Sequence, residues 1–335
     1  MKIDFVIPWV DGTDLKWIND KNKYLPENQN QISASEERYR SWDNLQYWFR
    51  AVEKFAPWVN HIYFVTWGHI PEWLNTDAEK LTVVKHRDYI PEKYLPTFSA
   101  NPIELNLHRI KNLEEHFVYF NDDFFLIDQV CPEDFFKDGL PCDYAVESPI
   151  TPNRKDVFNN ILINNMVLLN SQFSRKDVLK KWRRKFYSLA DLKGLMTNLC
   201  MSPLRRDDFF GFAYSHLPAN FLKSTFERVW NDNYEILDKV SGNKFRSTDD
   251  VNQYIISNYQ YAMGKFSPRG WAKVGEAIQL NDIEDNISYA CDMISGQKKK
   301  MVCINDSEVH SFERTRDRIN RALEKILPEK SIFER

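Results

Sequence analysis

Short apolar runs alternate with helical patterns through the first third of the chain, and this alternation constrains the fold more than any other feature. The runs typical of buried strands cover residues 3–9, 61–67, 81–86 and 116–121. Apolar residues recur at helical spacing over residues 43–55, and an asparagine N-cap before Pro102 predicts a second helix at Asn101. Repeated β-α-β units predict an α/β fold with a mainly parallel, Rossmann-like sheet and right-handed crossovers.

The rest of the chain is expected to extend this core. Residues 1–150 should form the α/β core itself. Residues 151–265 are mostly helical in pattern, from about Arg154 onwards, and should form an insertion or subdomain that contributes to the site. Residues 266–335 should complete the core with a strand near 301–304 and a final helix near 311–327.

Composition excludes several classes of function. The formal net charge of −3 lacks the basic excess of a nucleic-acid-binding protein. No stretch approaches the roughly 18–20 apolar residues that a membrane span needs. The five cysteines form no CxxC pair or Cys/His cluster, so we expect neither a zinc site nor a disulfide framework. Their odd number suits a reducing compartment such as the cytoplasm. The ten glycines form neither GxGxxG nor GxxxxGK[ST], so a bound phosphate must meet acids with a metal ion, arginines or helix N-termini.

Acidic residues follow two of the predicted strands, where ligands of parallel sheets bind. Asp122 and Asp123 come directly after an apolar strand and are typical of a Mg²⁺ or Mn²⁺ site that meets a diphosphate, although a capped turn explains them as well. Asp11 and Asp14 flank Gly12 after the first strand, where they either contact a nucleotide or a metal ion or form an Asx-type turn. The loops after Trp9, Trp67, His86 and Asn121 are therefore the first candidates for the site.

Further candidates lie on helices and loops. Glu104 and His108 share a helical face beside Arg109 and could position and deprotonate a hydroxyl, but Glu104 could equally belong to the helix cap and Asn101 is explained as the N-cap. His216 is a candidate that could also be a structural loop histidine. Arg246 with Asp249 and Asp250 could bind a phosphate or cap a helix, and Asn305 with Asp306 could form a site or a plain turn. The basic run from Arg175 to Lys185 suits an anionic membrane surface or a solvated helix face.

Four blocks in this order resemble the Stealth family, which includes bacterial capsular-polysaccharide phosphotransferases and the catalytic subunit of the animal lysosomal-enzyme N-acetylglucosamine-phosphotransferase. The first block is IDFVIPWVDGTD, and the second runs from Arg38 to Leu126 with LPTFSANPIELNLHRI and HFVYFNDDFFL. The third covers residues 216–263 with HLPANF and FRSTDDVNQYIISNYQYAM, and the fourth covers residues 302–334 from VCINDSEV. Together the blocks span nearly the whole chain, with departures from the family pattern at Ser41, Ala100 and Pro102.

The resemblance implies a GT-A-like nucleotide-sugar domain with a helical addition. It implies transfer of a hexose or N-acetylhexosamine 1-phosphate from a UDP-sugar to a hydroxyl of a lipid-linked oligosaccharide or growing surface polysaccharide, with release of UMP. The family's active-site positions fall on Asp11, Asp14, Asn101, Glu104, His108, Arg109, Asp122, Asp123, His216, Arg246, Asp250, Asn305 and Asp306.

We assign expected roles on that basis. Asp122, Asp123 and Asp306 should hold the metal ion, and His216, or else His108, should be the general base. Arg109 and Arg246 should neutralise the transferred phosphoryl group, with Glu104 and Asp250 beside them. The donor should be bound by Asp11, Gly12, Asp14, Asn101 and Asn305. The alternatives are a conventional glycosyltransferase that releases UDP and a non-catalytic subunit that binds a carbohydrate or a partner protein.

Overall fold

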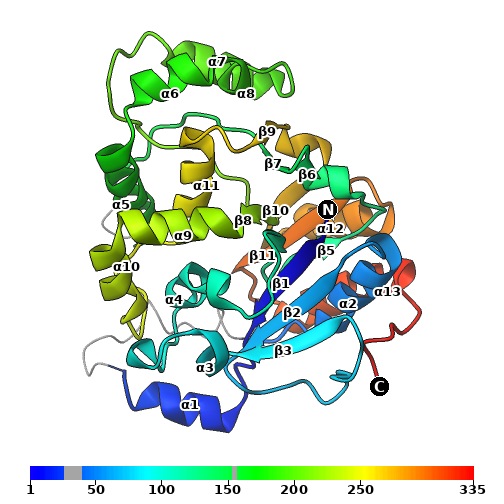
Figure 1. Ribbon diagram of the computed structural model, residues 1–335. Helices are drawn as coiled ribbons and strands as arrows, with labels where there is room; N and C mark the ends of the chain where they lie inside the picture. Colours follow the sequence, from blue (N-terminus) through cyan, green and yellow to red (C-terminus); the bar gives the residue numbers. More distant parts are fainter. Residues whose placement is uncertain (26–39, 153–156) are drawn as a thin grey trace.

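The computed structural model describes residues 1–25, 40–152 and 157–335, so the expected boundaries at Arg38 and Arg154 lie outside the described residues. A five-stranded sheet stands at the centre in the order β3-β2-β1-β4-β8 (Figure 1). Its strands are β1 (Ile3–Trp9), β2 (His61–Thr66), β3 (Leu81–Lys85), β4 (His116–Tyr119) and β8 (Ala219–Leu222). The first four run parallel and β8 runs antiparallel to β4, so the predicted mixed α/β fold with a mainly parallel sheet is confirmed.

The first strand is apolar apart from the buried Asp4, because helices cover both faces of the sheet. Phe5 and Ile7 belong to one apolar core, while Val6 between them belongs to the other, as the period of two in a strand requires. The first core contains residues of α2 (Leu45–Phe55), α12 (Glu284–Ser295) and α13 (Phe312–Ile326). The second contains residues of α5 (Val157–Gln172), α9 (Lys223–Asp232), α10 (Tyr234–Ser241) and α11 (Tyr254–Ala262).

A second sheet brings the C-terminal segment to the end of β4. Its strands are β10 (Gly275–Asn281), β11 (Met301–Glu308) and β5 (Phe124–Leu126), in the order β10-β11-β5. Because β5 follows β4 after the turn at residues 121–123 and pairs antiparallel with β11, residues far apart in sequence meet beside that turn. A small third sheet contains β6 (Phe136–Lys137), β7 (Leu140–Asp143) and β9 (Ser267–Pro268).

Shorter helices frame the carboxyl ends of the central strands. They are α1 (Leu15–Asn22), α3 (His86–Tyr89) and α4 (Ala100–Leu105). The expected N-cap of α4 is wrong by two positions, because Ser99 occupies the cap and Asn101 lies buried inside the helix. Among the described residues, no helix is both long enough and apolar enough to cross a bilayer.

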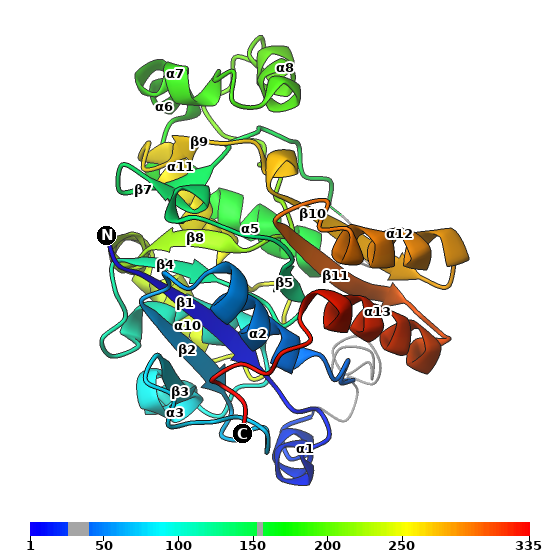
Figure 2. The same cartoon turned by 90° about the vertical axis from the view of Figure 1, so that its right-hand side faces the viewer.

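The middle segment supplies both an edge strand of the central sheet and a separate end of the molecule. Helices α6 (Arg175–Lys181), α7 (Arg183–Phe186) and α8 (Leu192–Met201) lie together at the end far from the central sheet (Figures 1 and 2). Arg175 does not lie on this surface, because its guanidinium is buried and makes two hydrogen bonds to the Glu147 carboxylate. Lys185 is also engaged, with its ammonium donating to the carbonyl of Phe266 at 2.7 Å.

The Arg175–Glu147 pair should anchor this end of the molecule. Glu147→Ala leaves a buried guanidinium without its partner carboxylate, which costs about 3–5 kcal/mol of unfolding free energy. Urea denaturation followed by circular dichroism measures this loss. Glu284→Ala, which removes an exposed carboxylate that pairs with Arg314 and Arg318, is the control and should cost less than about 1 kcal/mol. An equal loss in the two variants would contradict the anchoring role.

Candidate active site

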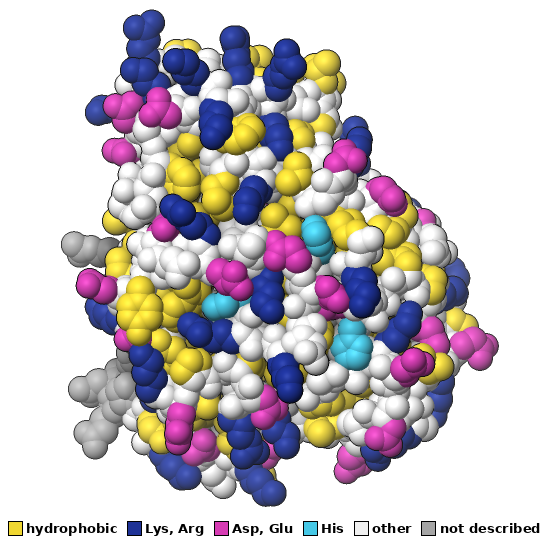
Figure 3. All heavy atoms as spheres, in the orientation of Figure 1, with side chains coloured by type: hydrophobic (Ala, Val, Ile, Leu, Met, Phe, Trp, Pro, Cys, Tyr) yellow, Lys and Arg dark blue, Asp and Glu magenta, His cyan; other side chains and the backbone are white. Residues whose placement is uncertain are grey.

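A cavity of about 710 Å³ opens at the carboxyl ends of the central strands. Its wall includes Trp9 after β1, His86 after β3 and Asn121 after β4, as expected, whereas Trp67 is not part of the wall. Acidic, basic and histidine side chains gather in the middle of the face shown in Figure 3. The sequence-predicted residues that the cavity brings together are Glu104, Asp122, Asp123, His216, Arg246, Asn305 and Asp306.

Two adjacent carboxylates form the acidic part of the wall. Asp122 faces the open cavity and is exposed there, yet the protein around it raises its pKa to about 6. Asp123 lies deeper, and burial together with the charge of Asp122 raises its pKa to about 7. One oxygen of Asp123, Oδ1, is shielded from solvent and has no hydrogen-bond partner among the described residues. The pair therefore has unused ligand oxygens and a mutual repulsion that a cation would relieve.

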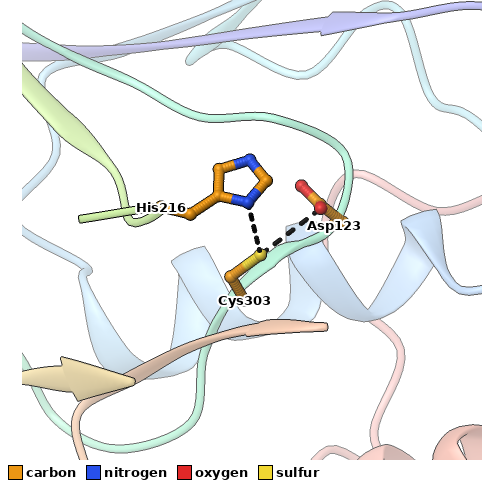
Figure 4. Close-up of side chains that lie close together, drawn as sticks. All are labelled: Asp123, His216 and Cys303. Atoms are coloured by element: carbon orange, nitrogen blue, oxygen red, sulfur yellow. Dashed lines mark hydrogen bonds between the residues drawn. The ribbon is translucent and has the colours of Figure 1, made fainter. Parts of the chain in front are cut away.

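His216 and Cys303 complete this corner of the cavity (Figure 4). The Cys303 thiol donates to Oδ2 of Asp123 at 3.3 Å, and its sulfur lies 3.7 Å from Nδ1 of His216. Because the thiol proton is used on Asp123, the sulfur lone pairs face the imidazole and favour the tautomer with hydrogen on Nδ1. Burial lowers the pKa of His216, so the ring is neutral near pH 7 and its Nε2 carries a free lone pair.

Glu104 and Arg246 form the opposite part of the wall. Burial raises the pKa of Glu104. The hydrogen bond from the Tyr119 hydroxyl at 2.7 Å and the positive charge of Arg246 act in the opposite direction and reduce the rise. Arg246 follows Phe245, which stacks on Phe98 with ring centroids 5.6 Å apart. The guanidinium therefore stands at a cavity that also holds two carboxylates, and an anionic ligand would be attracted to it.

Asp306 has a partner that the sequence did not indicate. Both of its carboxylate oxygens accept hydrogen bonds from Arg40, at 2.6 Å each. The Arg40 guanidinium also donates to the carbonyl of Val309 and lies over the ring of Phe312. A carboxylate held in this two-pronged way is already neutralised, so Asp306 is a weaker metal ligand than Asp122 and Asp123. Its neighbour Asn305 lines the cavity and donates to Gln279.

The loop after β1 has a structural role for each of its predicted site residues. Asp14 is the N-cap of α1 and accepts from the backbone of Lys16 at 2.8 Å. Asp11 accepts from the backbone and the hydroxyl of Thr13 across Gly12. Asp11, Gly12 and Asp14 lie outside the cavity wall, which the neighbouring Val10 and Trp17 reach instead.

Asn101 and Asp250 support the wall from behind. The Asn101 amide donates to Asp250 at 2.7 Å, and Asp250 also accepts from Asn243 and from the backbone of Ser247. Both residues are buried and neither lines the cavity. This network fixes the segment that carries Arg246, so Asn101 and Asp250 position a site residue and do not face the ligand space.

His108 and Arg109 lie outside the cavity as well. His108 is buried with its ring stacked on Phe226, and burial followed by the charge of Arg109 lowers its pKa to about 3. Arg109 lies over the ring of Trp230 and donates to Asn106. The structure therefore does not bring this pair to the acidic residues, and we do not propose His108 as a base.

The cavity also contains residues that sequence reasoning missed. Arg40, Trp42 and Cys303 lie in or beside its wall, and each depends on a contact across more than 80 residues of sequence. Only Cys303 carried a usable signal, because a strand period of two places it on the same side of β11 as the candidate Asn305. As a whole, the site offers carboxylates for a cation, a guanidinium for an anion and a neutral imidazole for a proton.

The fold and this set of groups define an α/β protein whose cavity offers the kinds of side chain that group-transfer enzymes use. The model of Stealth protein conserved region 1 matches residues 1–29, and that of conserved region 2 matches residues 38–142. The capsular polysaccharide phosphotransferase WcwK of Streptococcus pneumoniae is 42% identical over 100% of this chain and 98% of its own. The chain therefore belongs to the Stealth family and is a transferase by that membership.

Other relatives agree in length and in name. The receptor polysaccharide phosphotransferase WefC of Streptococcus oralis is 40% identical over 99% of both chains. The exopolysaccharide phosphotransferase cps2G of Lactiplantibacillus plantarum is 38% identical over 99% of this chain and 96% of its own. Among solved structures, the glycosyltransferase GlyE of S. pneumoniae covers 94% of this chain and 78% of its own at 11% identity, with a TM-score of 0.27 that is too low to support an argument.

The raised pKa of Asp123 predicts a specific pH dependence of stability. A carboxyl whose pKa is raised by folding stabilises the folded state while it is protonated, and this contribution is lost as the pH rises from about 4 to about 7. Asp123→Asn mimics the protonated form, so without divalent cations it should be more stable than the parent chain at pH 8, by on the order of 1–3 kcal/mol.

Thermal unfolding in chelator at pH 4.5 and pH 8 measures the difference. The gap should be large at the higher pH and close to zero at the lower one. A variant that is less stable than the parent chain at pH 8 would show that Asp123 is held as a satisfied anion.

Proposed function

We propose that this chain transfers a sugar 1-phosphate from a UDP-sugar to a hydroxyl of a capsular or other surface polysaccharide, either lipid-linked or growing. The observation that carries the proposal is the meeting of Asp122, Asp123, His216 and Arg246 at one cavity in a chain 42% identical, along its whole length, to a capsular polysaccharide phosphotransferase. A volume of about 710 Å³ suits a nucleotide sugar, since ligand pockets span roughly 300–1,000 Å³.

In the proposed reaction, the acceptor oxygen forms a bond to the β-phosphorus of the donor. The bond from that phosphorus to the bridging oxygen breaks, and UMP leaves with the bridging oxygen and its electron pair. The acceptor proton moves to Nε2 of His216, which is free because Nδ1 faces Cys303. Arg246 neutralises charge on the phosphoryl oxygens during the transfer. The product is a phosphodiester between the sugar and the acceptor.

Asp122 and Asp123 fit a hard divalent cation, Mg²⁺ or Mn²⁺. Oδ1 of Asp123 has no protein partner among the described residues. Burial raises the pKa of both carboxyls, and the charge of Asp122 adds to the rise at Asp123. Such a cation would supply charge neutralisation for the donor diphosphate. Since Arg40 occupies both oxygens of Asp306, we assign the ligands to the two adjacent aspartates.

The donor's uracil ring has aromatic partners in the same cavity. Trp9, Trp42, Phe98 and Phe245 belong to its wall, and flat apolar rings of this kind stack on a base. We propose that these rings bind the nucleotide, in place of Asp11, Gly12 and Asp14 in the neighbouring turn. The five cysteines are all free, which suits the cytoplasmic location that we propose for the reaction.

The nucleotide product tests the proposed reaction directly. The chain is incubated with a panel of UDP-sugars, Mg²⁺ and acceptor oligosaccharides, and the products are separated and examined by phosphorus NMR. Attack at the β-phosphorus yields UMP and a new phosphodiester. A conventional glycosyltransferase attacks the anomeric carbon instead and yields UDP, and that outcome would contradict the proposal.

His216→Ala should remove the base and leave the donor site intact. We expect turnover to fall about 10²–10⁴-fold, the range for loss of a positioned general base, while UDP binding measured by calorimetry changes little. His310→Ala is the matched control, because His310 is exposed and does not line the cavity. Normal turnover in His216→Ala would remove the imidazole from the mechanism.

Helix α8 presents its apolar side to solvent. Leu192, Met196 and Leu199 recur at helical spacing and are 65%, 67% and 51% exposed. The inward side carries Gly194, where a Cβ would approach Tyr144 to 2.6 Å, and Asn198, whose amide donates to two backbone carbonyls. A helix that buries a glycine and an asparagine while exposing leucine and methionine has its apolar face available for a partner.

The charges around α8 favour an anionic membrane as this partner. Residues 175–208 contain ten Lys and Arg against four Asp, a net charge of +6. Arg175 among them is buried and paired with Glu147, and other basic side chains line this end of the molecule (Figure 3). Each cation near an anionic surface contributes roughly 1 kcal/mol. We propose that this end docks on the membrane where a lipid-linked acceptor resides. The exposed cations that serve this role are Lys176, Lys180, Lys181, Arg183, Arg184, Lys193, Arg205 and Arg206.

Vesicle sedimentation tests the docking. The parent chain should pellet with vesicles that contain phosphatidylglycerol and remain in solution with pure phosphatidylcholine. The double variant Leu192→Glu/Met196→Glu should lose most of this binding, and Ile236→Glu on α10, which is also an exposed apolar position, should not. Equal binding of the two variants would show that α8 is not the contact.

A further inference from the structure

The side chains of Asp123, His216 and Cys303 come from three distant segments and face one another (Figure 4). Asp123 and His216 line the cavity, and Cys303 is buried beside them. One ligand atom from each residue, a carboxylate oxygen, a ring nitrogen and the sulfur, lies within 4.8 Å of the other two. Sulfur is 3.3 Å from the carboxylate oxygen and 3.7 Å from the imidazole nitrogen. No sequence spacing reveals this cluster, which explains why the scattered cysteines gave no indication of a metal site.

The two separations from sulfur are close to edges of a zinc coordination tetrahedron. Zn²⁺ binds thiolate at about 2.3 Å, imidazole nitrogen at about 2.0–2.1 Å and carboxylate oxygen at about 2.0–2.2 Å. At the tetrahedral angle, these bond lengths place sulfur about 3.5 Å from either light atom. The observed 3.3 Å and 3.7 Å lie on either side of this value.

The cluster differs chemically from the site of the proposed Mg²⁺ ion. Magnesium takes oxygen ligands in octahedral geometry, whereas a thiolate and an imidazole select softer ions such as Zn²⁺. Asp123 adds a second indication of a ligand, because its Oδ1 is shielded from solvent and has no partner among the described residues. Asp123 is common to the two sites, so the two ions exclude each other.

We propose that Cys303, His216 and Asp123 form a binding site for a thiophilic divalent cation of the Zn²⁺ class. The ion replaces the thiol proton, which leaves to solvent as the sulfur–metal bond forms. The hydrogen on Nδ1 moves through solvent to Nε2, and the lone pair that this frees on Nδ1 binds the ion. The site depends only on these three side chains and is independent of the proposed reaction.

A consequence for activity rests on the proposed function. A neutral imidazole that gives its Nδ1 lone pair to the metal carries its hydrogen on Nε2. Nε2 then has no lone pair for the proton of the acceptor hydroxyl. Zinc therefore blocks His216 through its tautomer and displaces the hard cation from Asp123, and it should inhibit the Mg²⁺-dependent reaction.

Metal binding is measured on the full metal-free chain with Co²⁺ as the probe. We expect a thiolate-to-cobalt charge-transfer band in the near ultraviolet, with one ion per chain, that one equivalent of Zn²⁺ abolishes. Cys303→Ser should lose the band and bind Zn²⁺ at least tenfold more weakly. Cys291→Ser is the matched control, since this half-buried cysteine lies on α12 away from the cavity, and it should retain both properties.

Circular dichroism shows whether Cys303→Ser folds. If it does not, His216→Ala serves as the second variant, and we expect it to bind Zn²⁺ at least tenfold more weakly than the parent chain. The absence of the band from the parent chain, or its persistence in both site variants, would overturn the zinc site. Because these assays follow metal absorption and not the nucleotide product, they separate failure of the zinc site from failure of the proposed reaction.

Discussion

Two neighbouring carboxylates, Asp122 and Asp123, follow β4, and the folded protein destabilises the charged form of both. Burial raises the pKa of Asp122 to about 6, and burial with the charge of Asp122 raises that of Asp123 to about 7. Among the described residues, the side chain that donates a hydrogen bond to Asp123 is the Cys303 thiol. Asp306 in the same cavity is, by contrast, balanced inside the protein by two hydrogen bonds from Arg40. The unbalanced pair is therefore the place where the protein depends on something it binds.

The strands and loops around these carboxylates bring further functional side chains beside them. The antiparallel pairing of β5 with β11 brings Cys303 to Asp123, and the loop before β8 brings His216 to Cys303. The resulting series of contacts fixes the imidazole tautomer and leaves Nε2 directed away from the thiol. Asp123 thus belongs to the proposed cation site and, through the Cys303 sulfur, also orients the proposed base.

Local pattern predicted the strands and their acidic ends, because buried parallel strands are apolar throughout and their ligands meet at one edge. It could not distinguish a residue that faces the cavity from one that supports it. Asn101 and His108 carry the right chemistry, yet packing directs one into a buried network with Asp250 and the other against Phe226. Arg40 was missed because its contact with Asp306 spans 266 residues of sequence.

The central claim is that Asp122 and Asp123 bind a hard cation that also contacts a nucleotide diphosphate. Crystals of the chain grown with Mn²⁺ and UDP, examined by anomalous scattering, test it most directly. The account predicts a single strong peak about 2.1–2.2 Å from carboxylate oxygens of these residues and from an oxygen of the diphosphate. A peak at Asp306, or UDP bound in the cavity without any cation at the aspartate pair, would contradict it.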